Sequence, residues 1–169
     1  MHLGEIVRLV FLDLISNGQL FDGSYTDLFM PKDIFPTKYV SDILADNSTD
    51  CAQVAELFRD QFSISPISAS DLQTIRSVCE TVVRRAAHLA ATAVSCVLKR
   101  LNRANVVIGV DGTTIQTVPN FQKWMTEKVM ELCQLIGCQT QVKFISVDDG
   151  SGKGAALAAC IAQKLQLHH

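Results

Sequence analysis

The sequence predicts an α/β fold, because strands and helices alternate along the last third of the chain. Two apolar runs of β-type residues, 106–110 and 141–147, each lead into a glycine-bearing turn. Helical patterns follow later, over 119–136 and 152–167. The 169 residues have the length of one domain, which we place over residues 1–169.

The first elements are expected to be helices. Apolar residues recur on one broad face over 3–16, and Asn17-Gly18 supplies the left-handed residue that ends many helices. Only two residues precede this helix, so we expect a truncated N-terminus. Residues 20–36 contain Gly23, Pro31 and Pro36 and are predicted to be irregular.

Three further helices are predicted before the first strand. Thr37 can cap a short helix over 38–44, and another helix is expected from residue 50 or 51 to 62. Ser70, with Asp71 in the first turn, opens the longest helical pattern, which ends near Asn102. Its second half is nearly apolar on every side, which favours a central helix that packs against neighbours in several directions.

The last third begins with strand 106–110, the dipeptide Asp111-Gly112 and a second β-type run over 114–118. Asp-Gly between two such runs is a strong hairpin signal. A helix over 119–136, a strand over 141–147 and a helix over 152–167 are predicted to follow.

The composition is typical of a soluble globular protein, with 48% hydrophobic residues, 19% charged residues and a net charge of −2. No basic region indicates nucleic-acid binding, and the apolar stretches are far shorter than the roughly 20 residues that span a bilayer. The first 15 residues lack the features of a secretory signal. The six cysteines form no CxxC pair, so we expect reduced, buried thiols and a cytoplasmic location. A zinc site from Cys133, Cys138 and a histidine fits no common ligand spacing, and no metal site is assigned.

The run Gly150-Ser151-Gly152-Lys153-Gly154 is not a P-loop, because its spacing is wrong and Lys153 is not followed by Ser or Thr. Its glycines are explained either by a tight turn from strand to helix or by phosphate binding at Lys153 and the helix N-terminus. Asp111 is likewise either an ordinary turn aspartate or a ligand contact. His88 is interpreted as a packed core residue, and Arg84-Arg85 as a source of surface ion pairs rather than a phosphate grip.

Five blocks, in order, resemble the C-terminal part of the eukaryotic hexokinase and glucokinase family. They read GEIVRLVFLDL from Gly4, IFPTKYVSDI from Ile34, VVRRAAHLAA from Val82, VVIGVDGTTIQTVPNF from Val106 and DDGSGKGAAL from Asp148. The resemblance implies part of the large lobe of an actin-like ATPase (ribonuclease H-like) fold. It also implies transfer of the γ-phosphoryl group of ATP, bound with Mg²⁺, to the 6-hydroxyl of a hexose such as glucose.

The resemblance further implies an adenine-nucleotide surface, where hydroxyls and glycine N–H groups are suitable donors to phosphate oxygens. The residues of this sequence that match that surface are Thr37, Lys38, Ser41, Asp111, Gly112, Thr113 and Thr117. Thr117 stands where family members usually have leucine against the adenosine, and Val118 stands where they usually have histidine. The segment 148–154 matches a connecting segment near the junction of the two lobes, where it would support a hinge.

In the family, the catalytic aspartate, the sugar-binding residues and the first phosphate loop all precede the block matched from Gly4. No catalytic residue is therefore assigned, and we expect the chain alone to be inactive. The favoured hypothesis is a piece of a hexokinase. The alternative is a non-catalytic truncated isoform that binds a nucleotide or a full-length hexokinase. Loss of one lobe would expose apolar surface, which predicts self-association.

Overall fold

The computed structural model describes residues 3–147 and 149–166 of the chain. The elements in chain order are α1 (Leu3–Ser16), η1 (Phe21–Gly23), α2 (Thr26–Phe29), α3 (Thr37–Ala45), α4 (Ala52–Phe62), α5 (Ala69–Leu101), β1 (Asn105–Val110), α6 (Thr113–Thr117), α7 (Phe121–Leu135), β2 (Gln141–Ser146) and α8 (Gly150–Gln166). No described helix is long and apolar enough to cross a membrane.

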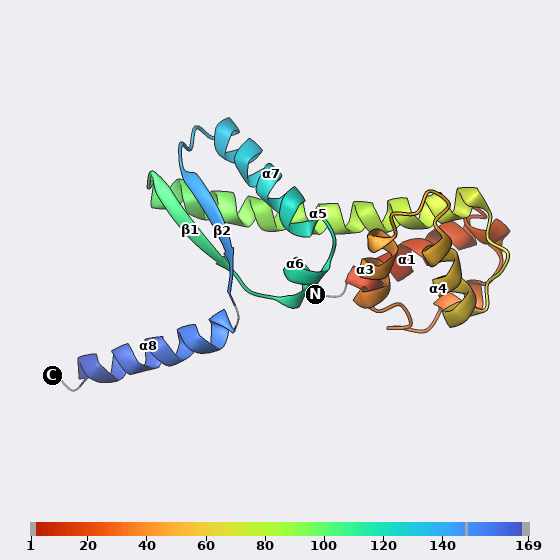
Figure 1. Cartoon of the computed structure of the whole chain (residues 1–169), viewed down its shortest axis with the longest axis horizontal. Coiled ribbons are helices and arrows are strands. Elements are labelled where there is room, and N and C mark those ends of the chain that lie inside the picture. The colour runs from red at the N-terminus through yellow and green to blue at the C-terminus, as the bar shows by residue number, and fades with distance from the viewer. Residues whose placement is uncertain (1–2, 148, 167–169) are drawn as a thin grey trace.

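The 33-residue helix α5 runs through the whole body of the molecule (Figure 1). At 1.5 Å per residue it is about 50 Å long. Helices α1 to α4 gather around its N-terminal half, whereas α7 and the two-stranded sheet lie along its C-terminal half. Helix α8 projects away from this body, and its described side chains from Ser151 to Lys164 are all exposed.

An aromatic cluster forms the core among α1 to α4. Its members are six phenylalanines whose neighbouring ring centroids lie 5.1–6.5 Å apart: Phe11, Phe21, Phe29, Phe35, Phe58 and Phe62. Edge-to-face pairs such as Phe11–Phe35, at 84°, place positive ring edges against negative ring faces. The cluster continues along the buried face of α5 to α7, so one hydrophobic core joins both halves.

The sheet is parallel, with β1 paired to β2 from Asn105 opposite Gln141 to Val110 opposite Ser146. Parallel neighbours require a long crossover, which α6 and α7 supply. The predicted Asp111-Gly112 hairpin and the strand over 114–118 are therefore wrong. Gly112 adopts φ +136°, ψ +134°, and its carbonyl oxygen accepts hydrogen bonds from Ile115 and Gln116 that begin α6.

The other expected elements are present, with changes at their ends. Helix α1 and its end at Gly18, with φ +69°, are confirmed. Pro36 rather than Thr37 is the N-cap of α3, because Thr37 is already helical. Ser68 rather than Ser70 caps α5, and its hydroxyl oxygen accepts a 3.0 Å bond from the Asp71 amide.

Two expectations about burial are wrong in part. The second half of α5 packs on one side and leaves Leu89, Val97 and Leu101 exposed by 56%, 57% and 46%. Of the six thiols, Cys51, Cys79 and Cys133 are buried as predicted, whereas Cys96 and Cys160 are exposed.

Candidate functional site

A hollow lies where the loop after β1 meets α1 and the middle of α5. We call it the α5–α6 hollow, and its volume is about 630 Å³. Its lining is mostly apolar, with polar groups along the loop: Leu3, Ile6, Val82, Arg85, Ala86, Leu89, Ala90, Asp111, Gly112, Thr113, Thr114, Ile115 and Phe121. An apolar cavity with a few polar groups on one side is the usual form of a small-molecule site.

The structure brings three of the seven predicted site residues into this hollow. Asp111, Gly112 and Thr113 form its polar side and are exposed to solvent. A Cβ atom added at Gly112 would meet nothing within 4 Å, so the space beside this glycine is open. Thr117 is exposed at the end of α6 but does not line the hollow, and its hydroxyl donates a 2.8 Å bond to the Thr113 carbonyl.

Thr37, Lys38 and Ser41 lie on α3, next to the hollow rather than in it. Gly4 provides the link, because its amide points to the Thr37 hydroxyl oxygen at 3.4 Å while the neighbouring Leu3 lines the hollow. In Figure 1, α3 and α6 accordingly lie on either side of the start of α1. The predicted residues thus form two groups, one on the loop after β1 and α6 and one on α3, and the start of α1 contacts both.

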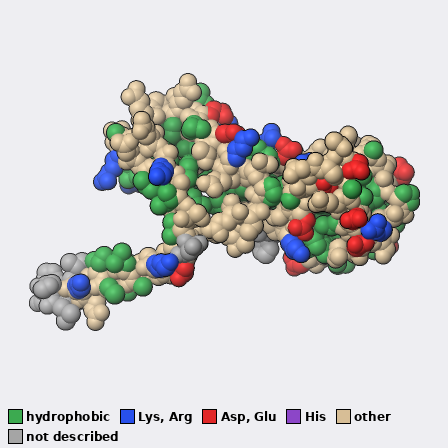
Figure 2. All heavy atoms as spheres, in the orientation of Figure 1, with side chains coloured by type: hydrophobic (Ala, Val, Ile, Leu, Met, Phe, Trp, Pro, Cys, Tyr) green, Lys and Arg blue, Asp and Glu red, His purple; other side chains and the backbone are tan. Residues whose placement is uncertain are grey.

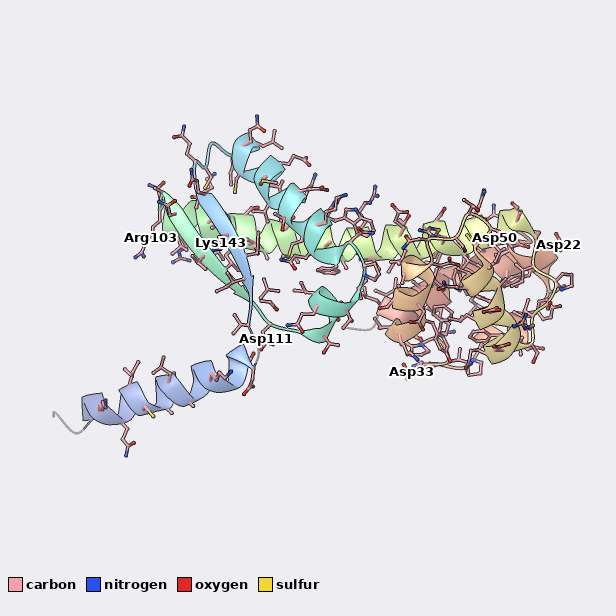
Figure 3. All side chains as sticks on the ribbon, viewed as in Figure 1. Asp22, Asp33, Asp50, Arg103, Asp111 and Lys143 are labelled. Atoms are coloured by element: carbon pink, nitrogen blue, oxygen red, sulfur yellow. The ribbon has the colours of Figure 1, made fainter. Side chains whose placement is uncertain are left out.

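The carboxylate of Asp111 is engaged by α8. Its Oδ2 accepts 3.2 Å hydrogen bonds from both the amide and the hydroxyl of Ser151, in the first turn of that helix. Figure 3 shows Asp111 at the junction between the sheet and α8. A carboxylate near a helix N-terminus is favourable because it satisfies free N–H groups and the helix dipole.

The glycine run forms the first turns of α8, and two of its glycines have close neighbours. A Cβ atom at Gly150 would lie 3.0 Å from Val147 Cγ1, and one at Gly152 would lie 2.6 Å from Asp149 Oδ1. These contacts support the tight-turn interpretation of the run. Lys153 is exposed in the first turns of α8, and Asp148 lies outside the described residues.

Sequence reasoning did not assign Arg85 to the site, although its side chain lines the hollow opposite the loop after β1. Among the residues that the structure describes, no carboxylate forms an ion pair with Arg85. The adjacent Arg84 differs, because it pairs with Glu80 and lies 4.9 Å from the Trp124 ring centroid on α7. The sequence contained one signal for this difference, because consecutive residues of a helix point about 100° apart and the two arginines cannot face the same neighbours.

Known proteins of one family match this chain over nearly its whole length. The hexokinase family model matches residues 1–161. The hexokinase of Brugia malayi is 38% identical over 164 residues, which cover 97% of this chain and 28% of that protein. Mouse hexokinase-3 is 37% identical over 176 residues, which cover the whole of this chain and 18% of the relative.

A solved structure of the Schistosoma mansoni hexokinase complexed with glucose matches 91% of this chain and 34% of that chain, with a TM-score of 0.82 and 32% identity. The predicted actin-like fold of a partial hexokinase is thereby confirmed. The chain spans about a third or less of each of these three relatives. From the family model, the relatives and the shared fold together, the chain belongs to the hexokinase family.

Proposed function

We propose that this chain supplies the nucleotide side of a cytoplasmic, glycolytic hexokinase. The whole enzyme would transfer the γ-phosphoryl group of ATP to the 6-hydroxyl of a hexose such as glucose. The α5–α6 hollow carries the proposal, because three of the residues matched to the family's nucleotide surface meet there.

The chemistry of the hollow suits a nucleotide. Its apolar wall from α1 and α5 can cover a base or ribose, and the Thr113 hydroxyl can donate to phosphate oxygens. The Arg85 guanidinium adds a positive charge with a geometry that matches phosphate. Mg²⁺ would arrive with the phosphates of ATP, as in other phosphoryl-transfer enzymes.

We further propose that the 169-residue chain does not phosphorylate glucose by itself. Phosphoryl transfer needs a base for the attacking hydroxyl and donors that hold the phosphates in line. The carboxylate in the hollow, Asp111, is held by Ser151 of α8 and is therefore a poor candidate for that base. The matched parts of the three relatives cover only 18–34% of their length.

Titration of the purified chain with a fluorescent ATP analogue and Mg²⁺ tests the binding proposal, and a glucose-dependent ADP-release assay tests the catalytic one. Thr113→Glu should abolish saturable binding, because its carboxylate repels phosphate while remaining favourable at the start of α6. Gln122→Glu makes the same charge change at an exposed position on α7 and should bind normally. Equal binding by both variants would contradict the assigned site, and glucose-dependent ADP release above a heat-killed control would contradict the inactivity.

A second candidate function is interaction with another hexokinase chain or a second copy. An apolar groove of about 390 Å³ between α5 and β1 favours it, with Val97 and Val107 exposed by 57% and 62%. Helix α8 exposes Leu157 and Ile161 as well, and Figure 2 shows hydrophobic side chains over both regions. Exposed apolar patches often mark interfaces. Sedimentation velocity should show concentration-dependent dimers or larger species, and a strictly monomeric chain would exclude self-association.

A further inference from the structure

Two cysteines meet at the end of α7. The helix closes with a Schellman motif, in which the Gly137 amide bonds to the Gln134 carbonyl at 3.3 Å and the Cys138 amide bonds to the Cys133 carbonyl at 2.8 Å. Gly137 has the left-handed conformation that this motif requires, with φ +68°. The motif brings the side chains at its first and last positions into contact. In α7 these positions are occupied by Cys133 and Cys138.

The same motif ends α1, where the Gln19 amide bonds to the Leu14 carbonyl at 2.8 Å. There the paired positions hold Leu14 and Gln19, which have no redox chemistry. In α7 the two thiols are close enough for each to shift the pKa of the other. The backbone hydrogen bonds of the motif form whichever side chains stand at these two positions. The two thiols are therefore neighbours before any oxidation.

The surroundings make the two thiols different. Cys138 is half-buried, and its Sγ lies 3.1 Å from the Thr140 hydroxyl. That hydrogen bond lowers the pKa of the Cys138 thiol, and the charge of Lys99 on α5 lowers it further. Cys133 is 5% exposed, and burial raises the pKa of its thiol. Since the thiolate is the nucleophile, Cys138 is the more reactive member of the pair.

We propose that Cys133 and Cys138 form a reversible disulfide in response to a peroxide, with Cys138 reacting first and Cys133 resolving the product. The Cys138 thiolate attacks one peroxide oxygen, the O–O bond breaks, and a sulfenic acid and hydroxide form. The Cys133 sulfur then attacks the Cys138 sulfur, and the S–O bond of the sulfenic acid breaks. The departing hydroxyl group takes up the proton that Cys133 releases and leaves as water. Two thiols are oxidised and one hydrogen peroxide is reduced to two waters.

Disulfide formation would change the turn between α7 and β2. The sulfurs must approach to about 2.05 Å, which joins the last turn of α7 covalently to the segment that enters β2. Opening of the Schellman motif is then prevented. A dithiol reductant would restore both thiols by exchange.

The test uses the full chain with the exposed Cys96 and Cys160 changed to serine, which leaves the pair and two buried thiols. After hydrogen peroxide treatment, alkylation and digestion should yield a linked peptide containing Cys133 and Cys138, and dithiothreitol should release it. In Cys133→Ala, a dimedone probe should instead label Cys138 as its sulfenic acid. In Cys138→Ser, Cys133 should remain reduced at the same peroxide concentration.

Circular dichroism of each variant checks that the helical content of the chain is retained. If Cys133 and Cys138 are both still alkylated under conditions that oxidise Cys96 in the unaltered chain, the proposal is wrong. It is also wrong if Cys138 is oxidised but never linked to Cys133, because the proximity argued from the Schellman motif would then not lead to bond formation.

Discussion

Replacing Gly4 by alanine would place a methyl group against the backbone where α1 crosses the start of α3. The new Cβ atom would lie 2.0 Å from the Phe35 carbonyl oxygen, 2.6 Å from the Pro36 carbonyl carbon and 2.8 Å from the Thr37 nitrogen. These neighbours are all backbone atoms, so no side-chain rotation can relieve the contact. The two elements would have to move apart, and Thr37 would move with α3.

The expected cost follows from this geometry. Carbon atoms in contact are normally about 3.5–4.0 Å apart, so the segments must separate by about 1.5 Å. Overpacking of this kind costs about 1–3 kcal/mol, and a contact this short belongs at the upper end. Alanine regains about 1 kcal/mol in helix propensity relative to glycine. The net loss is about 2 kcal/mol in the free energy of unfolding, or a fall of about 4–8 °C in Tm.

Urea denaturation followed by circular dichroism measures this loss. Gly154→Ala is the matched control, because its Cβ atom would meet nothing within 4 Å and α8 is exposed. The control should lose no stability and gain at most about 1 kcal/mol, because alanine is the better helix former and Gly154 is helical. If Gly4→Ala were as stable as Gly154→Ala, the close crossing of α1 and α3 would be refuted.

Three further outcomes are expected. The Arg8 guanidinium holds the pKa of Glu5 at about 2 instead of 4.5. The stability that this pair contributes is therefore complete above about pH 4.5 and is lost as the pH falls through about 2. The urea midpoint should vary less across this pH window in Glu5→Gln than in the unaltered chain. Arg85→Gln should weaken Mg-ATP binding about tenfold, as expected for loss of one charged hydrogen bond, whereas Arg84→Gln should leave binding unchanged. Equal effects of the two variants in a fluorescence titration would contradict the placement of Arg85 in the hollow. Leu101→Gln should reduce association in sedimentation velocity because it adds a polar group to the α5–β1 groove, and an undiminished dimer fraction would place the contact elsewhere.

Most helices could be predicted from the sequence because periodicity and end signals agreed. Helix α1, for example, combines a buried apolar face with Gly18 in the left-handed conformation. The strand predicted over 114–118 is wrong because the β-type residues there follow a turn dipeptide that usually makes hairpins. Here β2 supplies the partner of β1 from about 35 residues away, a non-local choice that local propensity does not contain.

The candidate site was predicted only in part, for a related reason. The resemblance identified the loop Asp111-Gly112-Thr113, which lines the hollow. It did not reveal that Asp111 is bound to Ser151, since their contact joins residues 40 positions apart. Nor did the sequence distinguish Arg84 from Arg85. That difference arises from the packing of α7, which places Trp124 beside the first guanidinium and not the second.

Helix α5 runs through both halves of the molecule, so a bend near its middle would move one half relative to the other. Arg85, which lines the hollow, is the middle residue of this helix, with sixteen residues on either side. Each arm is about 25 Å long, so a bend of about 10° at the centre displaces an end by about 4 Å. A molecule that fills the hollow and alters the curvature of α5 there would swing the phenylalanine cluster relative to the sheet, without touching either one.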